Sequence, residues 1–402
     1  MNDKKNMNQT GNMENAEKIR SVKRRGKKSG RRRKRQIRKL ALIVLVLAAV
    51  VLISALILQK KVYHKYDVLS SAKNEDVQSS GYIQMGDCLL KYAADGAALM
   101  NQKEETLWKQ NYDMTNPVAD VQEETAVVAD KEGTLMHIFK KNAPVGAVET
   151  DKPILKVRVS SSGMVAAILE DGEKTWVNFY AADGSLIAEN QTRIDSPGYP
   201  VDLSVSPDGK LLMISYVYVE NGQTTSYVAF YNFGDAGQGA IDNIVAGFTY
   251  EGIMVPQVSY LRDGVSVAFR DNGFSIYEGG SIPKEAVNKK IKTDVISTFY
   301  SDKYIGLVFK SEKEDAKYTM QVYDISGKEQ FSKDFNIEYK NIKISGDMII
   351  LSNDSQVNMY SLNGGEKFNG SIDEGAIKDL FKVGRNRYFL VSENGIKTIK
   401  LK

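Results

Sequence analysis

Residues 153–190 read PILKVRVSSSGMVAAILEDGEKTWVNFYAADGSLIAEN and contain one complete unit of the fold. Apolar and polar side chains alternate in four short stretches, at 154–159, 164–169, 175–181 and 185–190, as in strands with one buried face. Short turn sequences that contain glycine separate these stretches, so the chain reverses direction after each of them. We therefore predict that the unit is a four-stranded antiparallel sheet.

The same unit recurs along the chain. Strand-turn-strand segments begin near residues 82, 118, 154, 201, 257, 295, 341 and 377. Their spacing averages about 42 residues, which is typical of four-stranded β-propeller blades, and the strands lack the apolar period of helical repeats. We predict an all-β fold, a single β-propeller of eight blades. Seven blades are the alternative, because weak repeats are easily miscounted by one.

The final unit ends after its third strand, near the C-terminus. A closed ring needs a fourth strand from elsewhere, and residues 63–70, which precede the first unit, are the candidate. Turn pairs that tolerate positive φ angles divide the strands throughout the repeat region. These pairs are Asp95-Gly96, Asp171-Gly172, Asp183-Gly184, Asp208-Gly209, Asn221-Gly222, Asp263-Gly264, Asn272-Gly273, Asn363-Gly364 and Asn394-Gly395.

The segment LSVSPDGKLL at residues 203–212 resembles the blade signature of WD40-like propellers, in which Ser-Pro-Asp-Gly turns between the first two strands. The other units depart from it, and no Trp-Asp pair follows residue 60. As a whole the chain resembles the uncharacterised membrane-anchored propeller proteins of Gram-positive bacterial envelopes. That resemblance implies a location and carries no known activity.

An apolar run, LALIVLVLAAVVLISALIL, occupies residues 40–58, with Ser54 as its one polar side chain. A helix of this length spans about 28 Å, close to the ~30 Å hydrocarbon core of a bilayer. A cleaved signal peptide is the alternative, but signal peptides have shorter basic and apolar regions. We predict a disordered tail over residues 1–39, one transmembrane helix over 40–59 and an extracytoplasmic propeller domain over 60–402.

Charge is segregated along the chain. Residues 1–39 carry 16 of the 54 Lys/Arg and 3 of the 50 Asp/Glu, which leaves 38 basic and 47 acidic residues in the remainder. The positive-inside rule then predicts a single-pass type II protein of the plasma membrane, with a cytoplasmic N-terminus. The tail is expected to contact anionic lipid. A nucleic-acid-binding arm is the alternative, but the tail lacks interleaved aromatics, so no nucleic-acid partner is expected.

Composition and motifs favour a protein without catalytic chemistry. One cysteine, Cys88, excludes a disulfide framework and a four-thiolate zinc site, and two histidines, His64 and His137, exclude a His-rich metal centre. No zinc-protease, serine-hydrolase or P-loop motif occurs. We predict no catalytic residue, no metal and no cofactor. Two carboxylates across a central pocket, as in glycosidases, are the enzymatic alternative, because sequence spacing does not reveal such pairs.

The longest unit, the fourth, offers the candidate binding residues. Tyr199, Phe248 and Tyr250 lie in or near its additional residues, and the loops between blades commonly bind partners in propellers. The alternative is that these three aromatics pack between blades.

The sequence therefore predicts a non-catalytic binding or scaffold module at the cell envelope, with an envelope protein or a wall polymer as its partner. Two alternatives belong to other classes. One is a propeller enzyme, a hydrolase or lyase that acts on glycans, and the other is an envelope sensor that signals through the basic tail.

Overall fold

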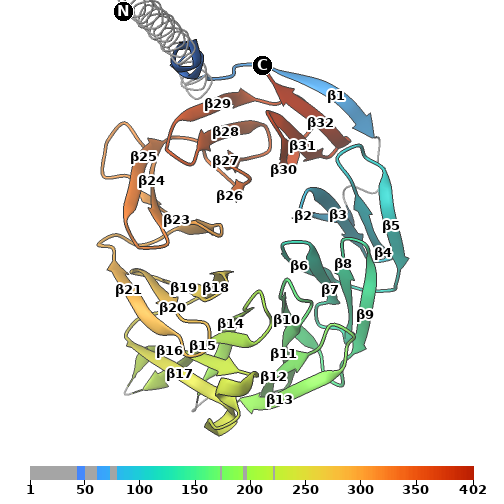
Figure 1. Ribbon diagram of the computed structural model, residues 1–402, viewed down its shortest axis with the longest axis vertical. Coiled ribbons are helices and arrows are strands. Elements are labelled where there is room, and N and C mark those ends of the chain that lie inside the picture. Colours follow the sequence, from blue (N-terminus) through green and yellow to red (C-terminus); the bar gives the residue numbers. More distant parts are fainter. Residues whose placement is uncertain (1–42, 50–60, 73–78, 173, 193–196, 221) are drawn as a thin grey trace, which may run out of the picture. The chain divides into compact units, whose positions relative to one another are not determined.

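The computed structural model describes residues 43–49, 61–72, 79–172, 174–192, 197–220 and 222–402. Within these residues the strands form eight four-stranded antiparallel sheets, arranged as blades around a central opening (Figure 1). The predicted eight-bladed all-β propeller is confirmed. Each predicted unit start lies within two residues of the first strand of a blade.

The blades follow one another in chain order. Blades 1 to 4 comprise β2 (Gly81–Met85), β3 (Cys88–Ala93), β4 (Gly96–Met100), β5 (Thr106–Asn111); β6 (Pro117–Gln122), β7 (Thr125–Asp130), β8 (Leu135–Lys140), β9 (Ala143–Glu149); β10 (Ile154–Val159), β11 (Val165–Asp171), β12 (Lys174–Tyr180), β13 (Leu186–Thr192); β14 (Tyr199–Val205), β15 (Leu211–Glu220), β16 (Gln223–Asn232) and β17 (Ile244–Glu251). Blades 5 to 8 comprise β18 (Gln257–Arg262), β19 (Val265–Arg270), β20 (Gly273–Glu278), β21 (Lys284–Lys290); β22 (Ser297–Tyr300), β23 (Tyr304–Lys310), β24 (Tyr318–Asp324), β25 (Glu329–Phe335); β26 (Asn341–Ser345), β27 (Met348–Ser352), β28 (Gln356–Ser361), β29 (Glu366–Ser371); and β30 (Ile377–Gly384), β31 (Arg387–Ser392), β32 (Gly395–Leu401) with β1 (Tyr66–Ala72).

Strand β1 closes the ring, as the sequence predicts. It pairs antiparallel with β32, from Tyr66 opposite Leu401 to Ala72 opposite Ile396, and so completes blade 8 from the other end of the domain. The regular pairing begins at Tyr66, later than the predicted residue 63. The reason is that Tyr63 forms a parallel bridge with Phe368 of blade 7 instead of pairing with β32.

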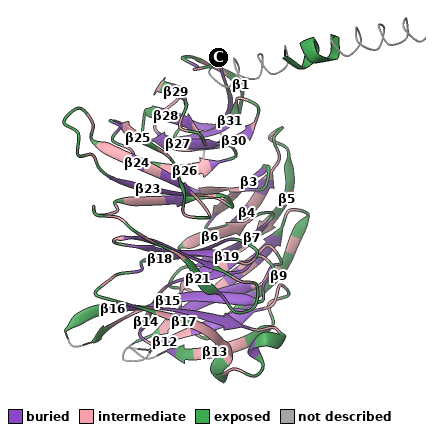
Figure 2. Cartoon of the chain, turned by 60° about the vertical axis from the view of Figure 1, so that its left-hand side comes forward, coloured by how far each residue is buried: buried purple, intermediate pink, exposed green. Residues whose placement is uncertain are grey.

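Apolar packing holds neighbouring blades together. Eight clusters of buried apolar side chains occur among the described residues, and each cluster joins two adjacent blades. Figure 2 shows the buried residues concentrated within and between the blades, with exposed residues on the outer strands and loops. Because burial of apolar surface contributes about 25 cal/mol per Å², these interfaces supply the main driving force for the ring.

The Ser-Pro-Asp-Gly turn of blade 4 shows how turns from adjacent blades meet. Gly209 has a φ of 75°, and a Cβ at this position would lie 2.3 Å from Cγ of Met164 and 2.6 Å from Oγ of Ser162. Both neighbours belong to the corresponding turn of blade 3. Glycine is therefore required for its conformation and for the close approach of the two turns.

The N-terminal segment is described by seven helical residues, 43–49. Among the described residues, no helix combines the length and the apolar character needed to span a bilayer. Most of the predicted transmembrane helix at 40–59, and all of the predicted tail at 1–39, lie outside the described residues, so both stay predictions.

Candidate functional site

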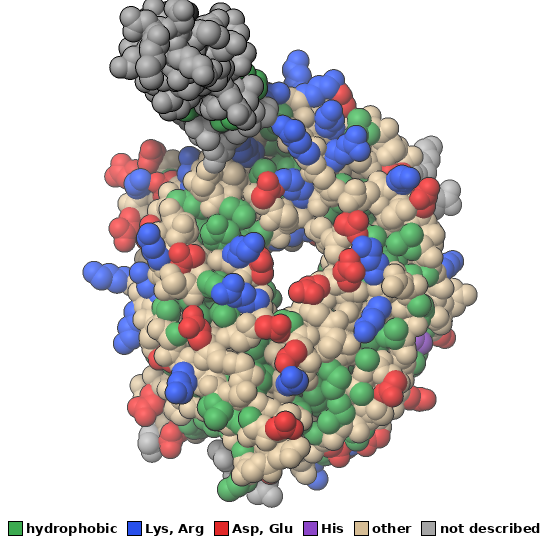
Figure 3. Space-filling view, viewed as in Figure 1, with side chains coloured by type: hydrophobic (Ala, Val, Ile, Leu, Met, Phe, Trp, Pro, Cys, Tyr) green, Lys and Arg blue, Asp and Glu red, His purple; other side chains and the backbone are tan. Residues whose placement is uncertain are grey.

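A polar cavity opens at the central channel, at the end where the first strand of each blade turns into the second. It has a volume of about 620 Å³ and takes lining residues from blades 1 to 7. The first strands of the blades lie innermost in Figure 1. Figure 3 shows the opening through the ring with acidic and basic side chains around it. The cavity is therefore built by short segments that lie far apart in the sequence.

The innermost strands place polar side chains toward the channel by simple alternation. In β6, Asp120 and Gln122 share one face, and their side chains accept the backbone N–H groups of Val159 and Ser161 in blade 3, each at 2.9 Å. The inner edge of each first strand has no strand partner, so its N–H groups need acceptors from side chains.

The same arrangement recurs between blades 4 and 5. Asp202 Oδ2 accepts the N–H of Val258 at 2.9 Å, and Ser204 Oγ accepts the N–H of Tyr260 at 2.8 Å. The polar residues of the channel thus first serve to join the innermost strands. Only the atoms left over after this pairing can contact a ligand.

Arg158 links blades 2, 3 and 4 through two carboxylates. Its Nη2 lies 3.1 Å from Asp202 Oδ1, and its Nη1 lies 3.8 Å from Asp120 Oδ1. Lys156 Nζ also lies 3.1 Å from Asp202 Oδ1. The Asp202 side chain is only 2% exposed, so this ion pair network is removed from water at its centre.

The pKa directions reflect this burial. Burial raises the pKa of Asp120, and the positive charge of Arg158 only partly opposes that effect. Burial alone would lower the pKa of Arg158, but the charges of Asp120 and Asp202 outweigh it, so the pKa of Arg158 is raised. The guanidinium therefore stays charged and holds both carboxylates.

Tyr300 supplies the aromatic side of the cavity. It ends β22, is 37% exposed, and packs against Phe269 with ring centroids 5.7 Å apart. Burial raises its pKa, so its hydroxyl is neutral and able to donate a hydrogen bond. The cavity thus combines an exposed tyrosine with paired charges and with the amides of Gln84 and Gln122.

This arrangement is suited to polar recognition. Both oxygens of Asp202 are occupied, one by Lys156 and Arg158 and the other by the N–H of Val258. A glycosidase needs one protonated carboxyl and a second free carboxylate on either side of the scissile bond. No group of three or more His, Cys, Asp or Glu side chains is placed to hold a metal within the described part of the chain.

A family profile matches residues 59–401, nearly all of the chain beyond the apolar segment. The chain belongs to DUF5711, a family of unknown function. No curated protein matches the DUF5711 chain.

Two solved structures of other proteins share the β-propeller architecture of this chain. BamB from Moraxella catarrhalis is 12% identical, with a TM-score of 0.52 over 84% of this chain and 100% of its own. The computationally designed Ika8 protein is 11% identical, with a TM-score of 0.54 over 83% of this chain and 98% of its own. At these identities the likeness shows the β-propeller fold alone.

None of the three aromatic residues predicted for binding lines the channel cavity. Tyr250 is buried, and its hydroxyl is hydrogen-bonded to the hydroxyl of Tyr277 and to the carboxylate of Glu285. Phe248 packs against Tyr277, with ring centroids 4.8 Å apart. These contacts match the packing alternative between blades 4 and 5, and a binding role for either residue stays a prediction.

Tyr199, the third predicted residue, lies half-buried at the start of β14. Strands β15 and β16 lie between Tyr199 and Tyr250 in the sheet of blade 4, so the structure does not bring the three aromatics together as one site. A binding role for Tyr199 also stays a prediction.

The channel residues were missed from sequence, although a signal exists. Asp120, Arg158 and Asp202 each interrupt an apolar strand that follows a proline, at Pro117, Pro153 and Pro200. Irregular pairing lies between Ile154 and Lys156 and between Pro200 and Asp202, so counting from the proline does not reveal which residues face each other.

Cys88 is buried in β3, between blades 1 and 2. Burial, together with the nearby carboxylate of Asp87, raises the pKa of the thiol to about 11. The thiolate is the reactive form, so the folded chain has an unreactive cysteine.

Proposed function

We propose that this protein is a non-catalytic binding module held at the outer face of the plasma membrane, which recognises an envelope protein or wall polymer at its channel opening. The observation that carries the proposal is the cavity of about 620 Å³, whose polar side chains are already joined in an ion pair network. Such a rigid, hydrogen-bonding surface favours selective binding, because its groups are fixed before the partner arrives.

The absence of catalysis is part of the proposal. Asp120 and Asp202 both interact with Arg158, and each oxygen of Asp202 already has a hydrogen-bond partner. One oxygen of each carboxylate faces Arg158 and the other accepts a backbone N–H, so neither group is placed to exchange a proton with a substrate. The paired state of the two groups supports recognition over hydrolysis.

The proposed location rests on the sequence of residues 1–61. The apolar run at 40–58 is long enough to cross a bilayer, and the basic residues before it favour a cytoplasmic tail. Strand β1 begins at Tyr66, eight residues after this run, so a short stretch of chain would link the ring to the membrane anchor. The ring would then be accessible to molecules of the envelope.

Thiol labelling in intact cells tests the location. With Cys88 buried and its pKa raised to about 11, the unchanged protein is expected to give almost no labelling by a membrane-impermeant maleimide. Lys109→Cys, on the exposed side of β5, is expected to label in intact cells. Ser29→Cys, in the tail, is expected to label only after permeabilisation. Labelling of the tail variant in intact cells, or of Lys109→Cys only after permeabilisation, would contradict the topology.

Site-specific crosslinking tests the binding surface. A photoreactive amino acid in place of Asp302, at the mouth of the cavity, is expected to give a discrete adduct with one envelope component. The matched control places the same amino acid at Lys109, on the outer strand of blade 1, where no adduct is expected. The same adducts at both positions, or none at position 302, would refute the channel opening as the binding surface.

A further inference from the structure

A second pocket lies between blades 3 and 4, away from the channel. It has a volume of about 160 Å³ and an apolar floor formed by β12, β15 and β16. The floor residues are Val177, Phe179, Leu212, Ile214 and Tyr231, all of them buried. Side chains of β13, the outer strand of blade 3, form one wall.

The other wall comes from an insertion that the other blades lack. Residues 233–243 join the third and fourth strands of blade 4 and contain the 3₁₀ turns η2 (Asp235–Gly237) and η3 (Ile241–Asn243). The equivalent connections of blades 1 to 3 and 5 to 7 have at most five residues in the described chain. Phe233, at the base of the insertion, stacks on Phe179 of blade 3 with ring centroids 4.6 Å apart.

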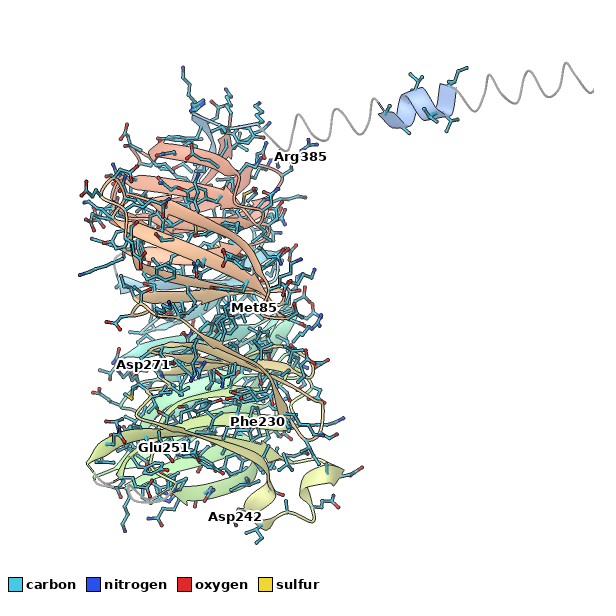
Figure 4. The ribbon with its side chains drawn as sticks, turned by 90° about the vertical axis from the view of Figure 1, so that its left-hand side faces the viewer. Met85, Phe230, Asp242, Glu251, Asp271 and Arg385 are labelled. Carbon is cyan, nitrogen blue, oxygen red and sulfur yellow. The ribbon has the colours of Figure 1, made fainter. Side chains whose placement is uncertain are left out.

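The tip of the insertion is held in an unusual conformation. Asp242 and Asn243 have φ angles of 54° and 59°, in the left-handed region that residues other than glycine adopt less often. Both residues line the pocket. This conformation leaves Ile241 86% exposed beside them. Figure 4 shows Asp242 on this insertion, at the edge of the ring. Aspartate and asparagine adopt this region more readily than other residues with side chains, so both suit this turn.

The size of the pocket selects its occupant. An apolar cavity of about 150 Å³ accommodates a benzene molecule. The pocket, at about 160 Å³, therefore matches one phenyl ring.

Charge at the rim selects the neighbours of that ring. Asp242 lies on the insertion side of the rim. Glu189 lies opposite Asn178, on the other face of the sheet, where its carboxylate accepts a hydrogen bond from Asn178 Nδ2 at 3.1 Å and lies 4.0 Å from Lys152 Nζ. Asp242 makes no side-chain hydrogen bond or ion pair with the described residues, so its charge is open to a partner. Residues 40–402 carry 47 of the 50 acidic residues and 38 of the 54 basic residues of the chain. This excess of negative charge further favours a cationic partner.

We propose that this pocket is a protein-docking site that binds the phenylalanine side chain of a partner segment with a basic residue beside it. The phenyl ring lies on the apolar floor, while Asp242 attracts the lysine or arginine side chain that flanks it. Buried aromatic anchors within a rim that excludes water dominate the affinity of such interfaces. This site is separate from the channel opening and does not depend on the proposed function.

Fluorescence polarisation with labelled peptides on the full-length chain tests the proposal. The probe is Gly-Lys-Ala-Phe-Ala-Lys-Gly, and the control peptides carry serine in place of phenylalanine or glutamate in place of both lysines. The phenylalanine peptide is expected to bind saturably below about 1 mM, and the serine peptide about tenfold or more weakly. The glutamate peptide is expected to bind least.

Two variants locate the binding. Ala188→Leu places three extra carbon atoms in the pocket and is expected to weaken binding of the phenylalanine peptide at least tenfold. Asp242→Asn keeps a residue that tolerates the left-handed conformation. It is expected to weaken binding of the phenylalanine peptide about threefold, because the rim loses one negative charge. Asp235→Asn removes the same charge elsewhere on the insertion and is expected to change nothing.

Three results of the peptide measurements would overturn the proposal. They are equal binding of the phenylalanine and serine peptides, unchanged binding by both Ala188→Leu and Asp242→Asn, and no saturable binding of any peptide. A dimer of the chain that Ala188→Leu dissociates would show that a second copy occupies the pocket, and would also overturn it.

Discussion

A chain that begins at residue 79, and so lacks β1, is expected to unfold at least about 10 °C below a chain that begins at Val62. The loss leaves blade 8 with three strands and exposes the edge of β32. It also removes Tyr63, which is buried in the cluster that joins blades 7 and 8. Removal of one large buried aromatic side chain costs about 3–5 kcal/mol, and each kcal/mol lowers the midpoint by roughly 2–4 °C in a large domain.

Thermal unfolding followed by circular dichroism, together with size-exclusion chromatography, measures this effect. The free edge of β32 is expected to make the shorter chain associate, because unpaired edges recruit other strands. Tyr63→Ala and Val68→Ala are the matched point variants, since Tyr63 is buried whereas Val68 of β1 is 41% exposed. Equal midpoints for the two chain lengths, or equal effects of the two point variants, would mean that β1 does not stabilise the ring.

Asp202→Ala is expected to lower the free energy of unfolding by about 3–5 kcal/mol. The substitution leaves Lys156 and Arg158 without their shared carboxylate and the Val258 N–H without an acceptor. The Lys156 and Arg158 side chains are 34% and 31% exposed, so the effect comes mainly from the lost charge-assisted bonds and from the buried Val258 N–H left without an acceptor. Chemical denaturation measures it.

Two further variants separate the causes. Asp202→Asn keeps an oxygen for the Val258 N–H and removes only the charge, so it is expected to cost less than Asp202→Ala. Asp302→Ala, at the exposed mouth of the same cavity, is expected to change stability by less than about 0.5 kcal/mol. If Asp202→Ala were as mild as Asp302→Ala, the network would not stabilise the junction of blades 3, 4 and 5.

The fold was predictable because its signals are local and repeated. Alternation, glycine turns and the recurring unit each depend on residues close in sequence, and eight copies reinforce one another. The closing strand was also predictable, because the last unit lacks a fourth strand and residues 63–70 were free to supply it. Only its first residues differ, since Tyr63 turns toward Phe368 of blade 7.

The candidate sites were not predictable in the same way. Asp120, Arg158 and Asp202 lie on three different blades and meet only because the ring brings their inner strands together. The pocket between blades 3 and 4 likewise needs the packing of Phe233 on Phe179. Phe248 and Tyr250 show the converse, because an aromatic residue has the same appearance in sequence whether it packs between blades or contacts a partner.

The sequence by itself predicted the propeller class, eight blades with seven as the alternative, and the origin of the closing strand, because strand alternation and turn chemistry act over a few residues. It also determined the expectation of a membrane anchor, from the apolar run at 40–58. Only the tertiary structure decided which polar side chains pair in the channel and where cavities form. Those contacts join residues from different blades, and their register depends on strand irregularities and on packing that no single segment encodes.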